Sequence, residues 1–136
     1  MVGFSRLGFK QVLKKWYRAW NDHNLKEVVD LFHDDIIFEN WDGVTISGKK
    51  KLQRVWASWF KNHGNFCFIE KETFIDEIDQ KVLFSWKFTW PSRQNNSNKT
   101  ETIYGVDILH FSDNKIIRKN TFSKKKIECD GQKISV

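Results

Sequence analysis

The chain has little that would hold it in a membrane, bind a metal or cross-link it. Its 136 residues include only two cysteines, in unrelated segments, and no apolar run approaches the roughly 20 residues of a membrane span. The first residues lack the apolar core of a signal peptide. No two of the four histidines stand at a metal-ligand spacing. We therefore expect a cytoplasmic protein with reduced thiols, no metal and no cofactor.

Aromatic residues, in contrast, are abundant. The chain carries seven tryptophans and twelve phenylalanines, and such large rings usually fill a core or line a pocket. A chain of this length is expected to form one domain that buries roughly two thirds of its unfolded surface. No repeat or linker divides the sequence, so we expect a single domain over 1–136, with its core at about 8–123 and a basic tail over 124–136.

Three stretches with apolar side chains at helical spacing predict three helices near the N-terminus. Asn24 can cap the second helix, with Glu27 as its capping-box partner, and Gly64 can end the third. The three apolar stripes are Phe9, Leu13, Trp16, Tyr17 and Trp20; Leu25, Val28, Val29 and Phe32; and Leu52, Val55, Trp56, Trp59 and Phe60.

After the third helix the apolar pattern changes to the two-residue period of strands. Helices followed by antiparallel strands indicate an α+β protein, in which a strongly bent antiparallel sheet wraps three N-terminal helices and leaves a cone-shaped cavity. The predicted strands cover 36–39, 66–75, 81–90, 103–111 and 115–123, with a polar loop over 91–99 and room for one short strand in the basic tail.

Asp107 is the residue that breaks this pattern. In the strand over 103–111 it shares a face with the apolar residues Ile103, Leu109 and Phe111. A carboxylate on an apolar face is costly unless it is paired or neutralised. The position therefore requires either a structural partner or a chemical role, such as that of a proton donor or acceptor.

The partner of Asp107 depends on the register of the following hairpin. A simple two-residue hairpin places Asn120 opposite Asp107, whereas a bulged hairpin brings Lys119 or Thr121 round instead. An ion pair between Asp107 and Lys119 would favour a structural role for the carboxylate.

Three segments, in this order and spacing, resemble one family. Residues 16–25 with 31–35 are similar to its helix pair, 46–49 to the start of its third helix, and 105–111 with 115–116 to its penultimate hairpin. The family is the nuclear transport factor 2-like superfamily, which includes ketosteroid isomerases and SnoaL-like polyketide cyclases. The resemblance implies a cystatin-like α+β roll. It predicts function poorly, because this fold hosts enzymes, carriers and transport adaptors.

The resemblance also assigns roles to single residues. Asp107 matches the neutral carboxylic acid that donates to the oxyanion in ketosteroid isomerases, and SnoaL-like cyclases carry an acidic proton acceptor on this strand. Trp16 falls at the position of the isomerase oxyanion-hole tyrosine. Asn40 falls at that of the catalytic base, but an amide cannot take a proton near neutral pH. The steroid-isomerase mechanism is therefore not expected. Further pocket-wall positions are occupied by Trp20, Trp86 and Phe88.

Two functions remain open at this stage. The first is a small-molecule site for an apolar or aromatic ligand, in which Asp107 would catalyse cofactor-free proton transfer of the isomerase, cyclase or hydratase type. The second is a non-catalytic, dimeric interaction module whose core is plugged by tryptophans. For the first function, the predicted ligand-binding residues are Trp16, Trp20, Asn40, Trp56, Phe84, Trp86, Phe88 and Asn120.

The predicted partners follow from the other face of the same strand. Tyr104, Val106 and Ile108 point away from Asp107, and a homodimer through the outer sheet face would bury them. The lysine runs at 49–51 and 124–126 lack a stacking platform for bases, so a solvated basic face explains them. We expect no nucleic-acid or membrane partner.

Overall fold

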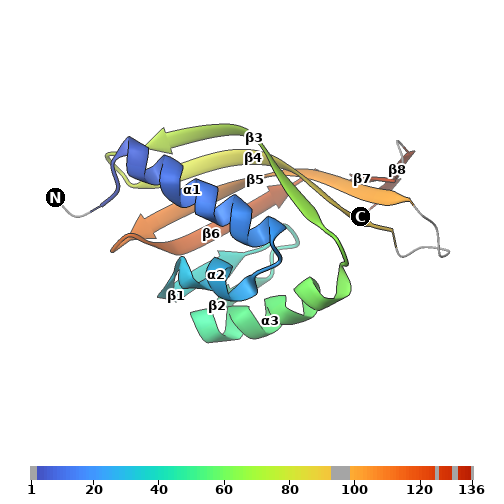
Figure 1. Cartoon of the computed structure of the whole chain (residues 1–136), viewed down its shortest axis with the longest axis horizontal. Coiled ribbons are helices and arrows are strands. Elements are labelled where there is room, and N and C mark those ends of the chain that lie inside the picture. Colours follow the sequence, from blue (N-terminus) through green and yellow to red (C-terminus); the bar gives the residue numbers. More distant parts are fainter. Residues whose placement is uncertain (1–2, 93–98, 125, 130–131, 136) are drawn as a thin grey trace.

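The protein is an α+β roll of three helices and a bent sheet (Figure 1). The computed structural model describes residues 3–92, 99–124, 126–129 and 132–135. Most of the predicted polar loop, and Lys125 in the second lysine run, therefore lie outside the described residues. The elements are α1 (Arg6–Asn21), α2 (Leu25–Asp30), β1 (Phe32–Glu39), β2 (Thr45–Ser47), α3 (Lys49–Asn62), β3 (Cys67–Asp76), β4 (Lys81–Pro91), β5 (Thr100–Ser112), β6 (Lys115–Ser123), β7 (Lys126–Cys129) and β8 (Gln132–Ser135).

The helix ends follow the signals in the sequence. The side chain of Asn24 accepts a hydrogen bond from the backbone N–H of Glu27 and caps α2. Helix α3 ends at Asn62, just before Gly64, which has a φ of 57°. Helix α2 is shorter than predicted, because Phe32 already belongs to β1. None of the helices within the described ranges is long and apolar enough to cross a membrane.

The sheet has the strand order β2-β1-β6-β5-β4-β3, and β7 and β8 are attached beside β5. Strands β3, β4, β5 and β6 pair antiparallel, as predicted. Strand β1, however, pairs parallel to β6, so the expectation of a purely antiparallel sheet is wrong at this pair. The basic tail forms two short strands, β7 and β8, rather than one.

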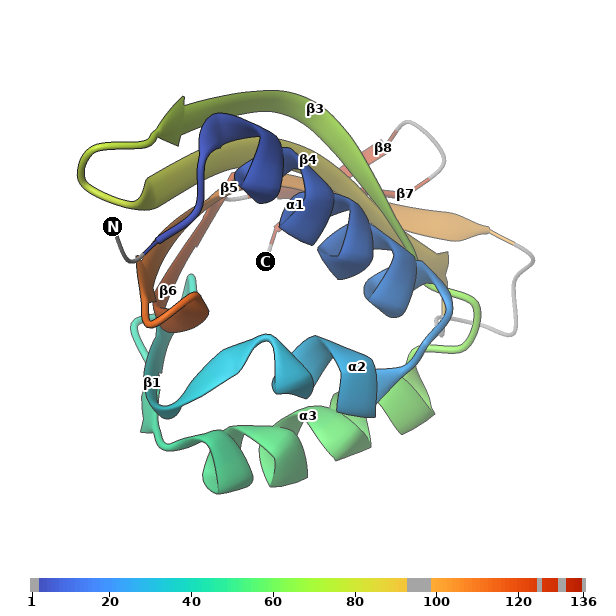
Figure 2. The same ribbon diagram turned by 60° about the vertical axis from the view of Figure 1, so that its left-hand side comes forward.

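The bent sheet places its concave face against the helices. In Figure 2 the sheet curves from β3, above α1, to β1 on the other side, and α2 and α3 lie across the open side. The alternation predicted for β4 is confirmed, since Phe84, Trp86 and Phe88 are all buried. Trp86 lies so close to Gly105 on β5 that a Cβ atom there would come within 2.4 Å of the indole ring. The position of this ring therefore depends on a glycine in the neighbouring strand.

Candidate functional site

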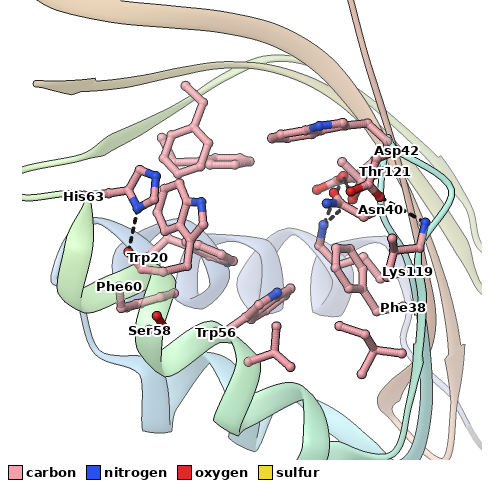
Figure 3. Close-up of a pocket in the computed structure, with 18 of the residues that line it drawn as sticks. Trp20, Phe38, Asn40, Asp42, Trp56, Ser58, Phe60, His63, Lys119 and Thr121 are labelled. Atoms are coloured by element: carbon pink, nitrogen blue, oxygen red, sulfur yellow. Dashed lines mark hydrogen bonds and ion pairs between the residues drawn. The ribbon is translucent and has the colours of Figure 1, made fainter. Parts of the chain in front are cut away.

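A cavity of about 450 Å³ lies between α3, the concave face of the sheet and the turn that joins β1 to β2. Its volume is within the range of small-molecule sites in proteins. Figure 3 shows His63 and Phe60 at one end of the cavity and Lys119 and Thr121 at the other. The lining residues are Trp20, Phe38, Asn40, Trp41, Asp42, Val44, Ile46, Val55, Trp56, Ser58, Trp59, Phe60, Asn62, His63, Phe68, Trp86, Phe88, Asp107, Lys119 and Thr121.

Three buried polar side chains form a cluster at the sheet end of this cavity. Asp107 on β5 is 1% exposed, and Lys119 and Thr121 on β6 are each 5% exposed. The ammonium nitrogen Nζ of Lys119 lies 3.1 Å from Oδ1 of Asp107. The hydroxyl of Thr121 lies 2.7 Å from the same Oδ1 atom and also contacts Nζ of Lys119. The carboxylate is therefore paired, and the open question of its partner is answered by Lys119 and Thr121 together.

A bulge in β6 produces this arrangement. The turn at Asp113 and Asn114 has positive φ at both residues, which is typical of a two-residue hairpin. The register then shifts between His110 and Phe111, because β6 contributes the extra residue Ile117. Asp107 consequently stands opposite Thr121. The hairpin is therefore the bulged one of the two forms, simple or bulged, that the sequence left open.

Aromatic rings surround the amine of Lys119. Its Nζ atom lies 4.9 Å from the ring centre of Phe38, 5.7 Å from that of Trp56 and 5.9 Å from that of Trp16. The burial disfavours the charged form and lowers the pKa of Lys119, while the neighbouring carboxylate of Asp107 acts in the opposite direction. The ring faces offset part of the lost hydration of the ammonium group.

Several polar atoms at the cavity have no hydrogen-bond partner among the described residues. Oδ2 of Asp107 is such an acceptor, and the indole N–H groups of Trp20 and Trp86 are such donors. Buried polar groups in proteins are nearly always bonded, so each exception calls for an explanation. All three residues line the cavity, so a ligand can supply the missing partners.

The C-terminal part of α3 and the residue after it line one end of the cavity. The ring of His63 stacks on that of Trp59, with centroids 3.8 Å apart and planes 9° from parallel. A hydrogen bond of 2.8 Å between Nδ1 of His63 and the carbonyl oxygen of Trp59 fixes this pair. Within the described residues, no three His, Cys, Asp or Glu side chains form a cluster that could hold a metal ion.

A family model supplies the context for this cavity. Residues 13–119 match the model of the SnoaL-like domain. The chain belongs to the SnoaL-like domain family. No curated protein matches its sequence.

Solved structures with low sequence identity share the SnoaL-like fold. One is a SnoaL-like protein from Burkholderia thailandensis, with 13% identity, a TM-score of 0.70, and coverage of 90% of this chain and 98% of that chain. A protein with a ketosteroid isomerase-like fold from Catenulispora acidiphila, in complex with trimethylamine, has 13% identity, a TM-score of 0.70, and coverage of 82% and 83%. TerC co-crystallised with polyporic acid has 15% identity, a TM-score of 0.70, and coverage of 85% and 90%.

The SnoaL-like domain brings most of the predicted site residues to one cavity. Two of them, Trp16 and Phe84, are buried but do not line it. Asn120 pairs with Ile108 and so lies on the opposite face of the sheet from Asp107. The predicted residues that do line the cavity are Trp20, Asn40, Trp56, Trp86, Phe88 and Asp107.

Sequence reasoning missed several residues of the cavity wall. The sequence indicates Lys119 and Thr121 only as partners of Asp107 and gives no sign that His63 lines the cavity, yet all three do. The apolar stripe of the third helix gave a signal for Trp59, since it lies one turn from Trp56. The question whether tryptophans plug the cone is also answered, because Trp56 and its neighbours form walls around an open volume.

Proposed function

We propose that this SnoaL-like domain binds a small, mainly apolar or aromatic molecule in the cavity, and that Asp107 transfers a proton on that molecule without a cofactor. The observation that carries the proposal is the unpaired Oδ2 of Asp107 in an aromatic cavity of about 450 Å³. The open cavity supports this function over a non-catalytic interaction module with a filled core. The reaction would be of the isomerase, cyclase or hydratase type.

The polar atoms of the cavity suggest how a ligand would be held. A ligand hydroxyl can donate to Oδ2 of Asp107, and a ligand carbonyl can accept from the indole N–H of Trp86. In proton transfer, Asp107 would take a proton from a carbon next to the carbonyl, and Lys119 would stabilise the oxyanion that develops. Asn40 can assist Lys119 in this role, whereas Trp16 cannot because it does not line the cavity.

Two of the similar structures are described with organic molecules, namely trimethylamine and polyporic acid. These ligands belong to those proteins. They support the choice of small organic molecules, both cationic and aromatic, for a first panel of candidate ligands.

The test compares ligand-induced thermal shifts of the wild type, Asp107→Asn and Asp34→Asn. Asp34 is an exposed aspartate on β1 and serves as the matched control. A ligand at roughly 100 times its Kd stabilises the folded state by about 2.7 kcal/mol. We expect this shift in the wild type and in Asp34→Asn, and a smaller shift in Asp107→Asn.

Two results would count against this proposal. If no member of the panel shifts the wild type, the binding function fails. If Asp107→Asn lowers the stability but keeps the full ligand response, Asp107 is structural only. For any ligand that binds, incorporation of deuterium from D₂O next to its carbonyl, followed by NMR, tests the proton transfer separately.

We also propose that the domain forms a homodimer through the convex face of the sheet. Phe74 is 61% exposed, Phe122 52% and Ile69 42%, although all three are large apolar residues. Strand pairing puts them on the same face as Val106 and Ile108, which are themselves partly exposed. Such a contiguous apolar surface is uncommon on a monomer. Sedimentation equilibrium tests the proposal, since it should give the mass of two chains.

A further inference from the structure

We propose that the ε-amine of Lys119 forms a reversible iminium, or Schiff base, with an apolar aldehyde or ketone bound in the cavity. This inference rests on the ligand-binding function proposed above and adds covalent chemistry to it. The proton-transfer role of Asp107 does not require this chemistry, so the two can be tested separately.

The amine of Lys119 lies at the cavity, and one of the three bonding directions at its Nζ atom is not used by a hydrogen bond. Nζ of Lys119 contacts Oδ1 of Asp107 and the hydroxyl of Thr121. Among the residues that the structure describes, it has no third hydrogen-bond partner. The remaining direction carries a proton in the ammonium form and the nucleophilic lone pair in the neutral amine. Since Lys119 lines the cavity, a bound carbonyl carbon can approach along this direction.

The surroundings favour the neutral amine more than water does. A surface lysine is fully hydrated and charged at neutral pH, which makes it a poor nucleophile. Lys119 is buried among Trp16, Phe38 and Trp56, and this burial lowers its pKa. The rings also suit the product, because an iminium cation at this position meets the same ring faces as the ammonium group.

Asp107 can carry the protons that the condensation moves. The amine nitrogen attacks the carbonyl carbon, so a C–N bond forms and the electron pair of the C=O π bond goes to oxygen. Asp107, which has taken the ammonium proton of Lys119, gives its proton to this oxygen and takes one from the nitrogen, which gives a carbinolamine and leaves Asp107 protonated. The nitrogen lone pair then forms the C=N bond as the hydroxyl leaves with a proton from Asp107. Amine, carbonyl and one proton thus give an iminium and one water, and hydrolysis reverses the step.

The unpaired Oδ2 of Asp107 offers a second contact to the intermediate of this reaction. Oδ1 is occupied by Lys119 and Thr121, while Oδ2 has no partner among the described residues. The carbinolamine hydroxyl can donate to Oδ2 while its nitrogen stays beside Oδ1. One carboxylate then serves both the nitrogen and the leaving oxygen, which is the arrangement that general acid–base catalysis requires.

The experiment traps the iminium by reduction. The wild-type protein is incubated with 2-naphthaldehyde and sodium cyanoborohydride near neutral pH, and the label is located by peptide mass spectrometry. We expect one main label per chain, on the Lys119 peptide. This label should exceed that on any other lysine peptide by at least about tenfold, well within the gain that positioning two reactants can give.

Three controls separate this inference from the proposed ligand site. Lys119→Met should lose the main label, and Thr121→Val should keep it at a lower rate, because Thr121 only positions the amine. The alcohol 2-naphthalenemethanol has the same rings without the carbonyl, so its thermal shift reports binding alone. Mapping on the wild type needs no variant, so the test stands even if Lys119→Met does not fold.

Two outcomes overturn the proposal. If the alcohol binds but the aldehyde labels only surface lysines, the Schiff base is excluded while the ligand site stands. If neither compound binds and the Lys119 peptide stays unlabelled, the inference fails together with this choice of ligand class.

Discussion

The two faces of the sheet depart from the usual distribution of side chains in opposite ways. The concave face buries a carboxylate and an amine, Asp107 and Lys119, among aromatic rings. The convex face leaves Phe74 and Phe122 largely exposed. Both arrangements cost free energy in an isolated chain, since buried charges lose hydration and exposed rings keep apolar surface in water. The comparison supports the two partners proposed above, a small molecule on the concave face and a second copy of the chain on the convex face.

Removal of one charge from the concave pair should have the largest effect. Asp107→Ala leaves the ammonium group of Lys119 buried without its partner, and we expect a loss of about 3–5 kcal/mol in the free energy of unfolding. Urea denaturation measures this loss. On the convex face, Phe74→Ala should change a monomer by about 0.5 kcal/mol or less.

The double variant Asp107→Leu/Lys119→Met tests the reason for that loss. It removes both charges and restores apolar contacts, so we expect it to regain most of the stability. If Asp107→Ala lowers the free energy of unfolding by no more than Phe74→Ala does, the two faces do not differ in this way.

Charges on the convex face should separate the dimer without affecting the cavity. We expect Phe74→Lys and Phe122→Lys each to raise the dimer dissociation constant by at least about tenfold. Each ring loses a burial worth about 1.5–3 kcal/mol, and tenfold corresponds to about 1.4 kcal/mol. Sedimentation equilibrium distinguishes the monomeric variants from dimers. The thermal shifts of these variants with cavity ligands should match those of the wild type. A change in ligand response would mean that the two faces are coupled.

The buried amine should also make stability depend on pH. The folded chain holds Lys119 at a pKa below the ordinary value of 10.5, so between these two values the unfolded chain binds more protons. The free energy of unfolding of the wild type should therefore rise with pH in this window. The variant Asp107→Asn/Lys119→Met lacks both groups and is the control. Urea melts between roughly pH 8 and 10 measure the difference, and equal slopes would contradict the assignment.

The smallest expected effect concerns His110, on the convex face. Partial burial, and then the charges of Lys81 and Arg118, lower its pKa from the ordinary 6.5. Below pH 6.5 the unfolded chain then binds the proton more readily, so stability should fall slightly as the pH drops toward the folded value and level off below it. His110→Gln should reduce this slope, and NMR titration of the imidazole gives the pKa directly.

The regular parts of the fold could be predicted because their side chains repeat with a clear period. The stripe of α1 and the alternation of β4 each reflect one buried face, so their extents follow from the sequence. Strand β1 begins at Phe32, earlier than the predicted strand over 36–39. The polar residues His33, Asp34 and Asp35 interrupt the apolar pattern at its start. The parallel pairing of β1 with β6 joins segments far apart in the chain, and no local pattern encodes such a contact.

The candidate site was predictable only in part, for a related reason. Asp107 could be predicted because it is a charged residue at an apolar position of an alternating strand, which the sequence alone shows. Lys119 could be assigned to the cavity only with knowledge of the register. The bulge that sets the register contains Ile117, an apolar residue that fits a regular strand equally well. Asn120 was accordingly placed in the predicted ligand set, although it lies on the convex face.

The extra residue in β6 decides which side chains of this strand reach the cavity. If Ile117 paired with His110 instead of forming the bulge, β6 would keep the simple hairpin register and every later residue of the strand would turn to the other side of the sheet. Asn120 would then stand opposite Asp107, and Lys119 would lie on the convex face. A change of register alone would thus replace the amine by an amide, without any substitution in the cavity. Deletion of Ile117, by contrast, would remove the bulge and keep Thr121 opposite Asp107.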